Sequence, residues 1–546
     1  MSLSAQSGAF TSTFHFRCGR QHVLDARFLL SALVLLAASE PSNGQGSQVR
    51  TSASVKPVTV LLDDTKTYQT IDNFSASDAW ACQFVGQWPA AKKEAIADLL
   101  FSTENGSNGR PKGIGLSMWR FNIGAGSTQQ GEASGIKDEW HRAESFMLPD
   151  GRYDWTRQAG QVWFMQAAKQ RGVKQFLGFL NSPPVQYTVT GRAFAADGKT
   201  NIAPTQYEAF AKFMADVVQG VQRTTGILFD YISPINEPQW DWSDPKQEGS
   251  PFRNQEIAGV TKALNAALEA QKLPTKILIT EAGKINYLLA TEDKPERGEQ
   301  ISAFFSVASP TYVGNLPRMA PVVAAHSYFT TSPYSEAVAL RQQLAAKVAT
   351  VPKLAFWQSE YCILGDNGGE INGNKRDLTI EPALYLARVI HNDLATANAA
   401  AWQWWLAVSP YDYKDGLIYV DKTKEDGNYQ TSKMLWALGN YSRFIRPGAV
   451  RIDARLTPDP NPDPNPDNQL LVSAYKNAGG KQLVTVVVNS ATTATDLQLK
   501  LGKKLGTVRT YTTSATTDLQ PGPVLKADQL VRLAPRSITT VVNEIR

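Results

Sequence analysis

The sequence predicts a (β/α)8 barrel joined to an antiparallel β-sandwich. Between residues 67 and 441, eight short apolar runs alternate with amphipathic stretches that have helical spacing, and eight such units close a parallel sheet into a barrel. Beyond residue 442 the hydrophobic pattern alternates with the period of a strand and the helical patterns cease. The 546 residues of the chain are enough for both parts.

The barrel strands are expected where the apolar runs lie. In chain order these are Ile71–Asp78, Ile114–Asn122, Gln175–Asn181, Phe229–Asn236, Lys276–Glu281, Val322–Ser327, Leu354–Glu360 and Ala400–Trp405. Nearly continuous apolar strands are typical of a parallel sheet that is covered on both faces. The clearest helical pattern is expected to begin at Thr205, with Glu208 completing a capping box.

The sandwich is expected to use strands from both ends of the chain. Its C-terminal strands are predicted at Leu470–Tyr475, Gln482–Asn489, Asp496–Leu501, Val508–Thr513 and Ser537–Asn543. An early strand, Pro57–Leu62, has no helix after it, so we assign residues 55–66 to the sandwich as well. The proline-rich segment 458–468 is expected to be a surface loop, because proline cannot donate to a sheet. The barrel then spans residues 67–441 and the sandwich residues 442–546.

The N-terminus has the pattern of a secretory signal. Arg17, Arg20 and Arg27 precede the apolar run Phe28–Ala38, which is shorter than the roughly 20 residues that a membrane span needs. We therefore predict a signal peptide over residues 1–39, a disordered linker over 40–54, and a secreted or periplasmic protein without a membrane span. An uncleaved anchor or a wrongly assigned start codon is the alternative.

Composition excludes several classes of protein. The net charge of +5 is spread along the chain without a basic stripe, which argues against a nucleic-acid partner. Five histidines and three cysteines without CxxC or HExxH spacing leave no zinc site, so no metal and no cofactor are expected. The sequence leaves open whether Cys82 and Cys362 form a disulfide, and it does not determine the oligomeric state.

Two of the predicted strands end in glutamate. The fourth strand runs into Asn236-Glu237-Pro238 and the seventh ends in Ser359-Glu360, and catalytic groups of this fold lie at the carboxyl ends of its strands. Two carboxylates at one opening are the minimal machinery for hydrolysing a glycoside. A structural ion pair would explain either glutamate alone equally well, but the two together favour catalysis.

Neighbouring residues assign a role to each glutamate. Asn236 offers an amide that can hold a sugar hydroxyl. Arg120 and Tyr328 are expected beside Glu360, where a positive charge and a hydrogen bond favour its ionised form. Glu237 is then expected to carry the proton as the acid and Glu360 to act as the nucleophile.

Three further residues near the predicted opening have two interpretations each. Glu281 closes the fifth strand and either lines the cleft or pairs with Lys284. Trp240 and Trp242 either stack on a sugar or pack within their loop.

These motifs resemble glycoside hydrolase family 30. The stretches that carry the resemblance are Ile71–Asp78, Trp119–Gly124, Asn181–Pro184, Asn236–Pro238, Ala325–Tyr328, Ser359–Glu360, Trp402–Trp405 and Ser442–Gly448. The resemblance implies that Glu237 is the acid/base and Glu360 the nucleophile, and that the N-terminal strand joins the sandwich. It also implies a set of sugar contacts: Asp78, Arg120, Asn236, His326, Tyr328 and Trp404.

The chain departs from the family pattern at Asn181, where members often carry tryptophan, and this makes a lipid-linked glucoside a less favoured substrate. We place Asn181 and Trp240 among the expected substrate contacts too. The forms Asn181–Pro184, Trp402–Trp405 and Tyr411–Gly416 resemble the endo-β-1,6-galactanase branch.

The sequence thus predicts a secreted retaining endo-glycosidase acting on a β-linked polysaccharide, with endo-β-1,6-galactanase as the favoured activity. A β-1,6-glucanase, a xylanase and a glucosylceramidase-like exo-glycosidase remain alternatives, as does a catalytically silent carbohydrate-binding protein. For a retaining enzyme the two carboxyl groups should lie about 5 to 5.5 Å apart, whereas about 7 Å or more would favour inversion.

Overall fold

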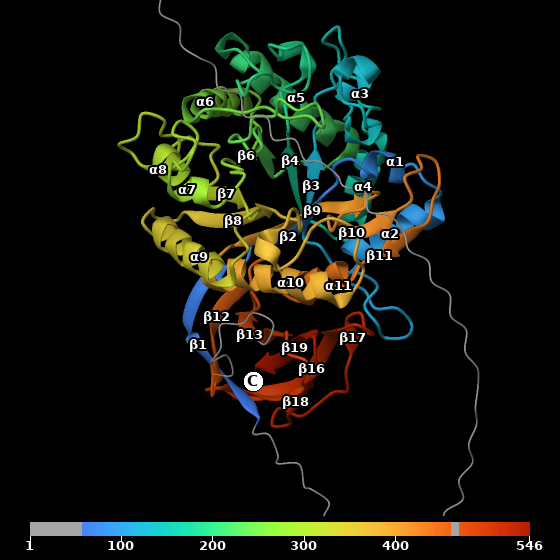
Figure 1. Cartoon of the computed structure of the whole chain (residues 1–546), viewed down its shortest axis with the longest axis vertical. Coiled ribbons are helices and arrows are strands. Elements are labelled where there is room, and N and C mark those ends of the chain that lie inside the picture. Colours follow the sequence, from blue (N-terminus) through green and yellow to red (C-terminus); the bar gives the residue numbers. More distant parts are fainter. Residues whose placement is uncertain (1–56, 460–468, 546) are drawn as a thin grey trace, which may run out of the picture. The chain divides into compact units, whose positions relative to one another are not determined.

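The computed structural model describes residues 57–459 and 469–545 (Figure 1). The predicted signal peptide and linker lie outside the described residues, as do residues 460–468 of the proline-rich segment. No helix in the described ranges is long and apolar enough to cross a bilayer.

The parallel sheet forms the (β/α)8 barrel that the sequence predicted. Its strands are β2 (Asn73–Ser77), β3 (Met118–Asn122), β4 (Gln175–Phe179), β5 (Tyr231–Ser233), β6 (Lys276–Ile277), β7 (Val322–His326), β8 (Ala355–Glu360) and β9 (Ala401–Ser409). Strands β9, β2, β3, β4, β5 and β6 are neighbours in that order, and β8 pairs with both β7 and β9. Backbone hydrogen bonds of Ala282 with Ala324 and His326 link the segment after β6 to β7.

Helices surround the barrel sheet (Figure 1). They are α1 (Cys82–Val85), α2 (Ala90–Phe101), α3 (Ser127–Gln130), α4 (Ala159–Gln170), α5 (Tyr207–Thr225), α6 (Asn254–Ala270), α7 (Asn286–Leu289), α8 (Gln300–Phe305), α9 (Tyr334–Ala349), α10 (Ile380–His391) and α11 (Lys433–Ser442). The capping box predicted at Thr205 was wrong, because a 3-10 turn over Pro204–Gln206 precedes α5 and no side chain caps it.

Two short strands extend the barrel sheet beyond β9. Strand β10 (Gly416–Val420) pairs in parallel with the second half of β9, and β11 (Tyr429–Thr431) pairs with β10. The sequence did not predict these strands. They fix the loop of residues 410–415, which follows the carboxyl end of β9.

The second sheet is the β-sandwich, and it is mostly antiparallel. Its order is β17 (Gln520–Pro521), β16 (Leu505–Thr513), β19 (Ser537–Ile545), β14 (Gln482–Asn489), β13 (Leu470–Lys476), β12 (Val450–Thr457), β1 (Val58–Thr70), β15 (Thr495–Leu501) and β18 (Val531–Leu533). The N-terminal strand β1 pairs antiparallel with β12 and parallel with β15. This confirms that the early strand belongs to the sandwich, although it runs further than predicted.

The sandwich packs against the barrel through α11. The side-chain amide of Asn440 donates to Thr540 Oγ1 at 3.0 Å and to the carbonyl oxygen of Tyr511 at 3.1 Å. Arg443 donates to four backbone carbonyls between Ser102 and Gly113. These polar contacts tie the last barrel helix to the sandwich and to the segment between α2 and β3, so the sandwich supports the barrel on the side of α10 and α11.

Candidate active site

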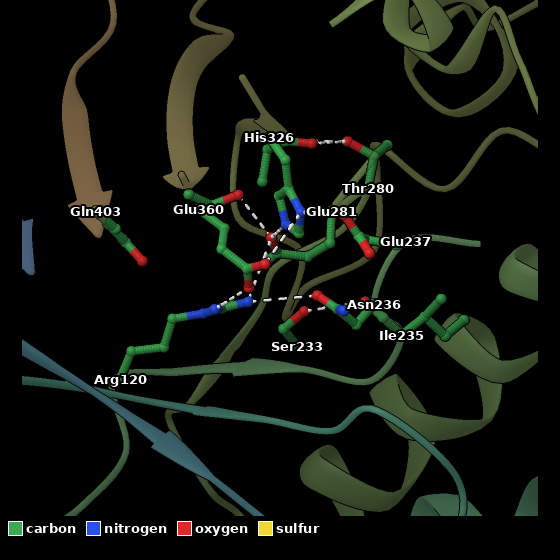
Figure 2. Close-up of polar contacts among 12 residues, drawn as sticks. Arg120, Ser233, Ile235, Asn236, Glu237, Thr280, Glu281, His326, Glu360 and Gln403 are labelled. Atoms are coloured by element: carbon green, nitrogen blue, oxygen red, sulfur yellow. Dashed lines mark hydrogen bonds and ion pairs between the residues drawn. The ribbon is translucent and has the colours of Figure 1, made fainter. Parts of the chain in front are cut away.

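Glu237 and Glu360 lie together at the carboxyl ends of the barrel strands (Figure 2). Glu360 is the last residue of β8, and Glu237 follows β5 after a short turn. One carboxylate oxygen of each, together with a ring nitrogen of His326, lie within 4.8 Å of one another. The side chains are almost buried, with 7% and 3% of their residues exposed, and both line one cavity of about 520 Å³.

The backbone that presents Glu237 has an uncommon conformation. Its φ is 44°, and Glu281 on the neighbouring segment has φ 45°, although side chains other than glycine rarely occupy this region. The N–H of Glu237 donates to the carbonyl oxygen of Glu281 at 2.9 Å, and the indole N–H of Trp242 donates to the carbonyl oxygen of Glu237 at 3.0 Å. Such strain persists where surrounding contacts hold it, most often at functional sites.

Arg120 and Tyr328 both donate to Glu360. Nη1 of Arg120, from β3, lies 2.5 Å from Oε2, and the hydroxyl of Tyr328 lies 3.1 Å from Oε1. The guanidinium reaches towards Asn236 as well, with Nη2 at 3.4 Å from its side-chain oxygen. A charge-assisted hydrogen bond of this kind stabilises the ionised form of a carboxylate and fixes its direction.

His326 connects three carboxylates at the base of the site (Figure 2). Its Nδ1 lies 2.9 Å from Oε1 of Glu237 and 3.5 Å from Oε1 of Glu360. Its Nε2 lies 3.0 Å from Oε2 of Glu281. Ser359 also donates to Glu281 at 2.6 Å. Glu281 is therefore the fixed end of a buried network, while Lys284 lies over the ring of Trp240 at 5.7 Å.

Burial and neighbouring charges shift the protonation of this network. Burial raises the pKa of Glu237, against the opposing effect of His326. Burial would also raise the pKa of Glu281, but the Arg120 charge and the His326 and Ser359 hydrogen bonds outweigh it and lower the value to about 2. Burial would lower the pKa of His326, yet the Glu360 charge and the bonds to Glu237 and Glu281 raise it to about 10. His326 is then a cation that donates from both ring nitrogens.

A charged His326 has a consequence for stability that can be measured. Its folded-state pKa of about 10 lies above the ordinary 6.5, so its contribution is complete below pH 6.5 and is lost as the pH rises through 10. We expect the free energy of unfolding, from urea titrations at pH 7 and pH 10, to fall more in wild type than in His326→Gln. An equal fall in both proteins would contradict a charged His326.

The cavity walls are mainly aromatic. The rings come from Trp80, Trp240, Trp242, Tyr328, Phe329, Trp405, Tyr411 and Tyr413. Trp80, Trp242 and Phe329 have φ values of 64°, 50° and 57°, so three of these rings stand on left-handed backbone. Phe329 is 59% exposed at the rim. Flat apolar rings around a polar floor are suited to stacking against the apolar faces of sugar rings.

The predicted substrate contacts fall into three groups. Asn236, Trp240 and Tyr328 line the cavity. Arg120 and His326 are fully buried behind the two glutamates and hold them rather than form the wall. The third group, Asp78, Asn181 and Trp404, is buried and does not line the cavity.

Asp78 and Asn181 are near the carboxyl ends of β2 and β4. Asp78 accepts hydrogen bonds from the backbone N–H of Asn122 at 2.7 Å and from the amide of Gln161 at 3.1 Å. Burial raises the pKa of Asp78 to about 7, although these two bonds lower it. Both residues therefore lie within the protein at this end of the barrel rather than on the wall of the cavity.

Trp405, rather than the expected Trp404, lies on the cavity wall. Side chains alternate along β9, so Trp402 and Trp404 stack on each other at 6.2 Å, and the indole N–H of Trp404 donates to the carbonyl oxygen of Asp415 at 2.7 Å. Trp405 points the other way, lines the cavity and meets Trp80 edge to face at 5.3 Å. Of the motif Trp402–Trp405, the structure thus puts Trp405 and not the expected Trp404 on the cavity wall.

These two tryptophans make a matched pair for testing substrate stacking. Trp405→Ala should raise KM for an oligosaccharide about fivefold or more, because a stacking ring is lost from the wall. Trp404→Phe should lower the melting temperature and leave KM within about twofold of wild type. An unchanged KM in folded Trp405→Ala would exclude Trp405 as a sugar platform.

Several wall residues were not among the expected substrate contacts. Trp80, His141, Tyr411, Tyr413 and Asp415 come from loops after β2, β3 and β9, and the rings of Trp80 and His141 lie 3.9 Å apart. The positions of these loops at the carboxyl ends of strands could have indicated them, and for the last three the motif Tyr411–Gly416 could have done so as well. Cys82 and Cys362, whose pairing the sequence left open, are both buried and free.

A (β/α)8 barrel with two close glutamates in an aromatic cavity at the carboxyl ends of its strands has the construction of a glycoside hydrolase. Comparison with known proteins gives the particular family. Residues 57–419 match the family described as O-Glycosyl hydrolase family 30, and the chain belongs to that family. It is therefore an O-glycosyl hydrolase.

Individual relatives cover most of the chain. An endo-beta-1,6-galactanase from Hypocrea rufa is 24% identical over 455 residues, which are 80% of this chain and 84% of the relative. The crystal structure of a conserved exported protein from Bacteroides fragilis is 36% identical, with a TM-score of 0.82 over 89% of this chain and all of that one. The catalytic domain of a family 30 xylanase from Talaromyces cellulolyticus is 21% identical, with a TM-score of 0.63 over 89% of this chain and all of that domain, and shares the fold.

Proposed function

We propose that the protein is a retaining endo-glycosidase in which Glu360 is the nucleophile and Glu237 the acid/base. The observation that carries this proposal is how close the two carboxylates are: an oxygen of each lies within 4.8 Å of the other in one cavity. Retaining enzymes keep their carboxyl groups about 5 to 5.5 Å apart, whereas inverting enzymes need about 6.5 to 9.5 Å to admit a water molecule.

The surroundings of each glutamate support its role in a double displacement. In the first step, a Glu360 oxygen bonds to the anomeric carbon while the glycosidic bond breaks, and Glu237 gives its proton to the departing oxygen. In the second step, Glu237 takes a proton from water, whose oxygen attacks the anomeric carbon and releases Glu360. The raised pKa of Glu237 suits a proton donor, and Arg120 and Tyr328 orient Glu360 for attack.

The favoured substrate is a β-1,6-linked galactan. Its support is the similarity to the endo-beta-1,6-galactanase of Hypocrea rufa, 84% of which is matched by this chain. The test is to incubate the purified protein with β-1,6-galactan, β-1,6-glucan, xylan and a glucosylceramide, and to record product sizes. We expect short oligosaccharides from β-1,6-galactan at the highest rate. Release of single sugars only would contradict endo action, and a higher rate on another glycan would replace galactan.

A catalytically silent carbohydrate-binding protein is not favoured, because both carboxylates are present and close together. Export is part of the proposal, supported by the basic and apolar pattern of residues 1–39 and by the exported protein of Bacteroides fragilis. Expression in a bacterial host followed by mass spectrometry of the periplasmic or extracellular protein should give a chain beginning near residue 40. An intact Met1 on protein retained in the cell would contradict export.

A further inference from the structure

Asp415 is an acidic residue of the cavity wall that the double displacement does not use. It immediately precedes β10, it is only 4% exposed, and it lines the same cavity as Glu237 and Glu360. Its carboxylate oxygen Oδ1 is buried and has no hydrogen-bond partner within the described part of the chain. Buried polar atoms without a partner are uncommon in folded proteins, and at a ligand site they often receive the ligand.

The backbone around Asp415 is held firmly although this oxygen is free. The carbonyl oxygen of Asp415 accepts the indole N–H of Trp404 at 2.7 Å, and the N–H of Gly416 donates to the hydroxyl of Tyr419 at 3.3 Å. Gly416 is also paired with Leu406 of β9. The carboxyl group is thus presented from a fixed position, which favours ligand binding because little ordering remains to be done.

The charge of the wall is one-sided. Its ionisable side chains are Glu237, Glu360, Asp415, His141 and three tyrosines, and across the described ranges no lysine or arginine lines it. The guanidinium of Arg120 is bound to Glu360, and Arg376, which is close enough to act on Asp415, does not line the cavity. Burial raises the pKa of Asp415 to about 7, with the Ser409 hydrogen bond opposing, and burial lowers the pKa of His141. A sugar carboxylate would find hydroxyl donors on this wall but no lysine or arginine side chain to pair with.

We propose that Asp415 determines specificity by accepting a hydrogen bond from a sugar hydroxyl, so that the cavity takes neutral glycans and rejects those with a uronic acid beside the cleaved bond. This inference rests on the proposed hydrolase function of the same cavity. A site built to bind a hydroxyl discriminates strongly, because an analogue that cannot supply the donor leaves a buried acceptor unpaired. An anionic substituent adds repulsion from the carboxylates of Asp415 and Glu360.

The test compares two oligosaccharides of the preferred linkage that differ in charge but hardly in size. One carries a glucosyl side group on the sugar next to the cleaved bond, and the other carries a glucuronosyl group there. Wild type should cleave the glucosyl compound with a kcat/KM at least about tenfold higher. Equal rates on the two compounds would overturn the inference without any variant. If the protein hydrolyses neither these compounds nor any unbranched glycan, the proposed function itself is overturned.

Variants locate the effect at Asp415. In Asp415→Asn the preference for the glucosyl compound should fall at least about fivefold, with KM for that compound raised. The control Asp412→Asn removes the same charge from the same loop outside the cavity, and it should keep the wild-type ratio. If the role of Asp415 is purely structural, Asp415→Asn should lower kcat/KM equally on both compounds and leave their ratio unchanged. That result would overturn the assignment. If Asp415→Asn does not fold, the wild-type comparison decides.

Discussion

Glu360→Ala is expected to reduce kcat on the preferred glycan by about 10⁴-fold or more, the scale seen when a covalent nucleophile is removed. Sodium azide should restore turnover, because the small anion fits the space left by the carboxylate and attacks the anomeric carbon directly. The product should be a glycosyl azide of inverted configuration, since only one displacement then takes place. Initial rates with and without azide, and NMR of the product, measure both effects.

The control for this variant is Glu132→Ala, which removes an exposed glutamate outside the cavity and should keep wild-type rates. Glu360→Ala must retain the wild-type circular dichroism spectrum for the comparison to count. Loss of Glu360 leaves the Arg120 guanidinium buried without its closest partner, so a lower melting temperature is expected as well. A folded Glu360→Ala that keeps activity, or that azide does not rescue, would remove Glu360 from the role of nucleophile.

Glu237→Gln is expected to lower kcat by about 10²- to 10⁴-fold on a glycan, whose leaving oxygen must be protonated. On a dinitrophenyl glycoside the leaving group departs without a proton, so formation of the glycosyl-enzyme should be far less affected. Pre-steady-state release of dinitrophenol separates this step from hydrolysis of the intermediate. In wild type, activity on the glycan should fall as the pH rises through the raised pKa of Glu237, because the acid form is then lost.

If Glu237→Gln slows formation of the glycosyl-enzyme equally on both substrates, Glu237 is not the general acid. Asn236→Ala is the matched variant beside it, since Asn236 lines the cavity but has no proton to give. Asn236→Ala should lower kcat/KM to a similar extent on both substrates. The contrast between neighbouring residues thus distinguishes proton donation from substrate positioning.

The barrel strands and the two glutamates could be predicted because they depend on local pattern. All eight apolar runs contain a strand, and most of the residues in these strands are buried. The ends of β5 and β6 were less predictable: both stop before the predicted limits at Asn236 and Glu281. There the backbone turns into the left-handed conformation at Glu237 and Glu281, which long-range contacts stabilise.

The remaining parts of the site depend on contacts between distant segments. Side chains of β9 point alternately towards and away from the cavity, and the sequence does not show which set points inwards. Trp404 was therefore expected as the substrate contact, whereas Trp405 lines the cavity. The bonds from His326 and Ser359 to Glu281 join the ends of three different strands. Asp415 reaches the cavity only because β10 pairs with β9, and neither strand pattern nor motif indicates that pairing.

The most direct test of paired glutamates acting by double displacement is the stereochemistry of wild-type hydrolysis. Proton NMR of the anomeric signals should be recorded within the first turnovers on a β-linked oligosaccharide, before the new reducing end mutarotates. Because oxygens of Glu237 and Glu360 lie within 4.8 Å of each other, we expect the β-anomer to appear first and the α-anomer only later. First appearance of the α-anomer would mean a single displacement by water and would contradict Glu360 as the nucleophile.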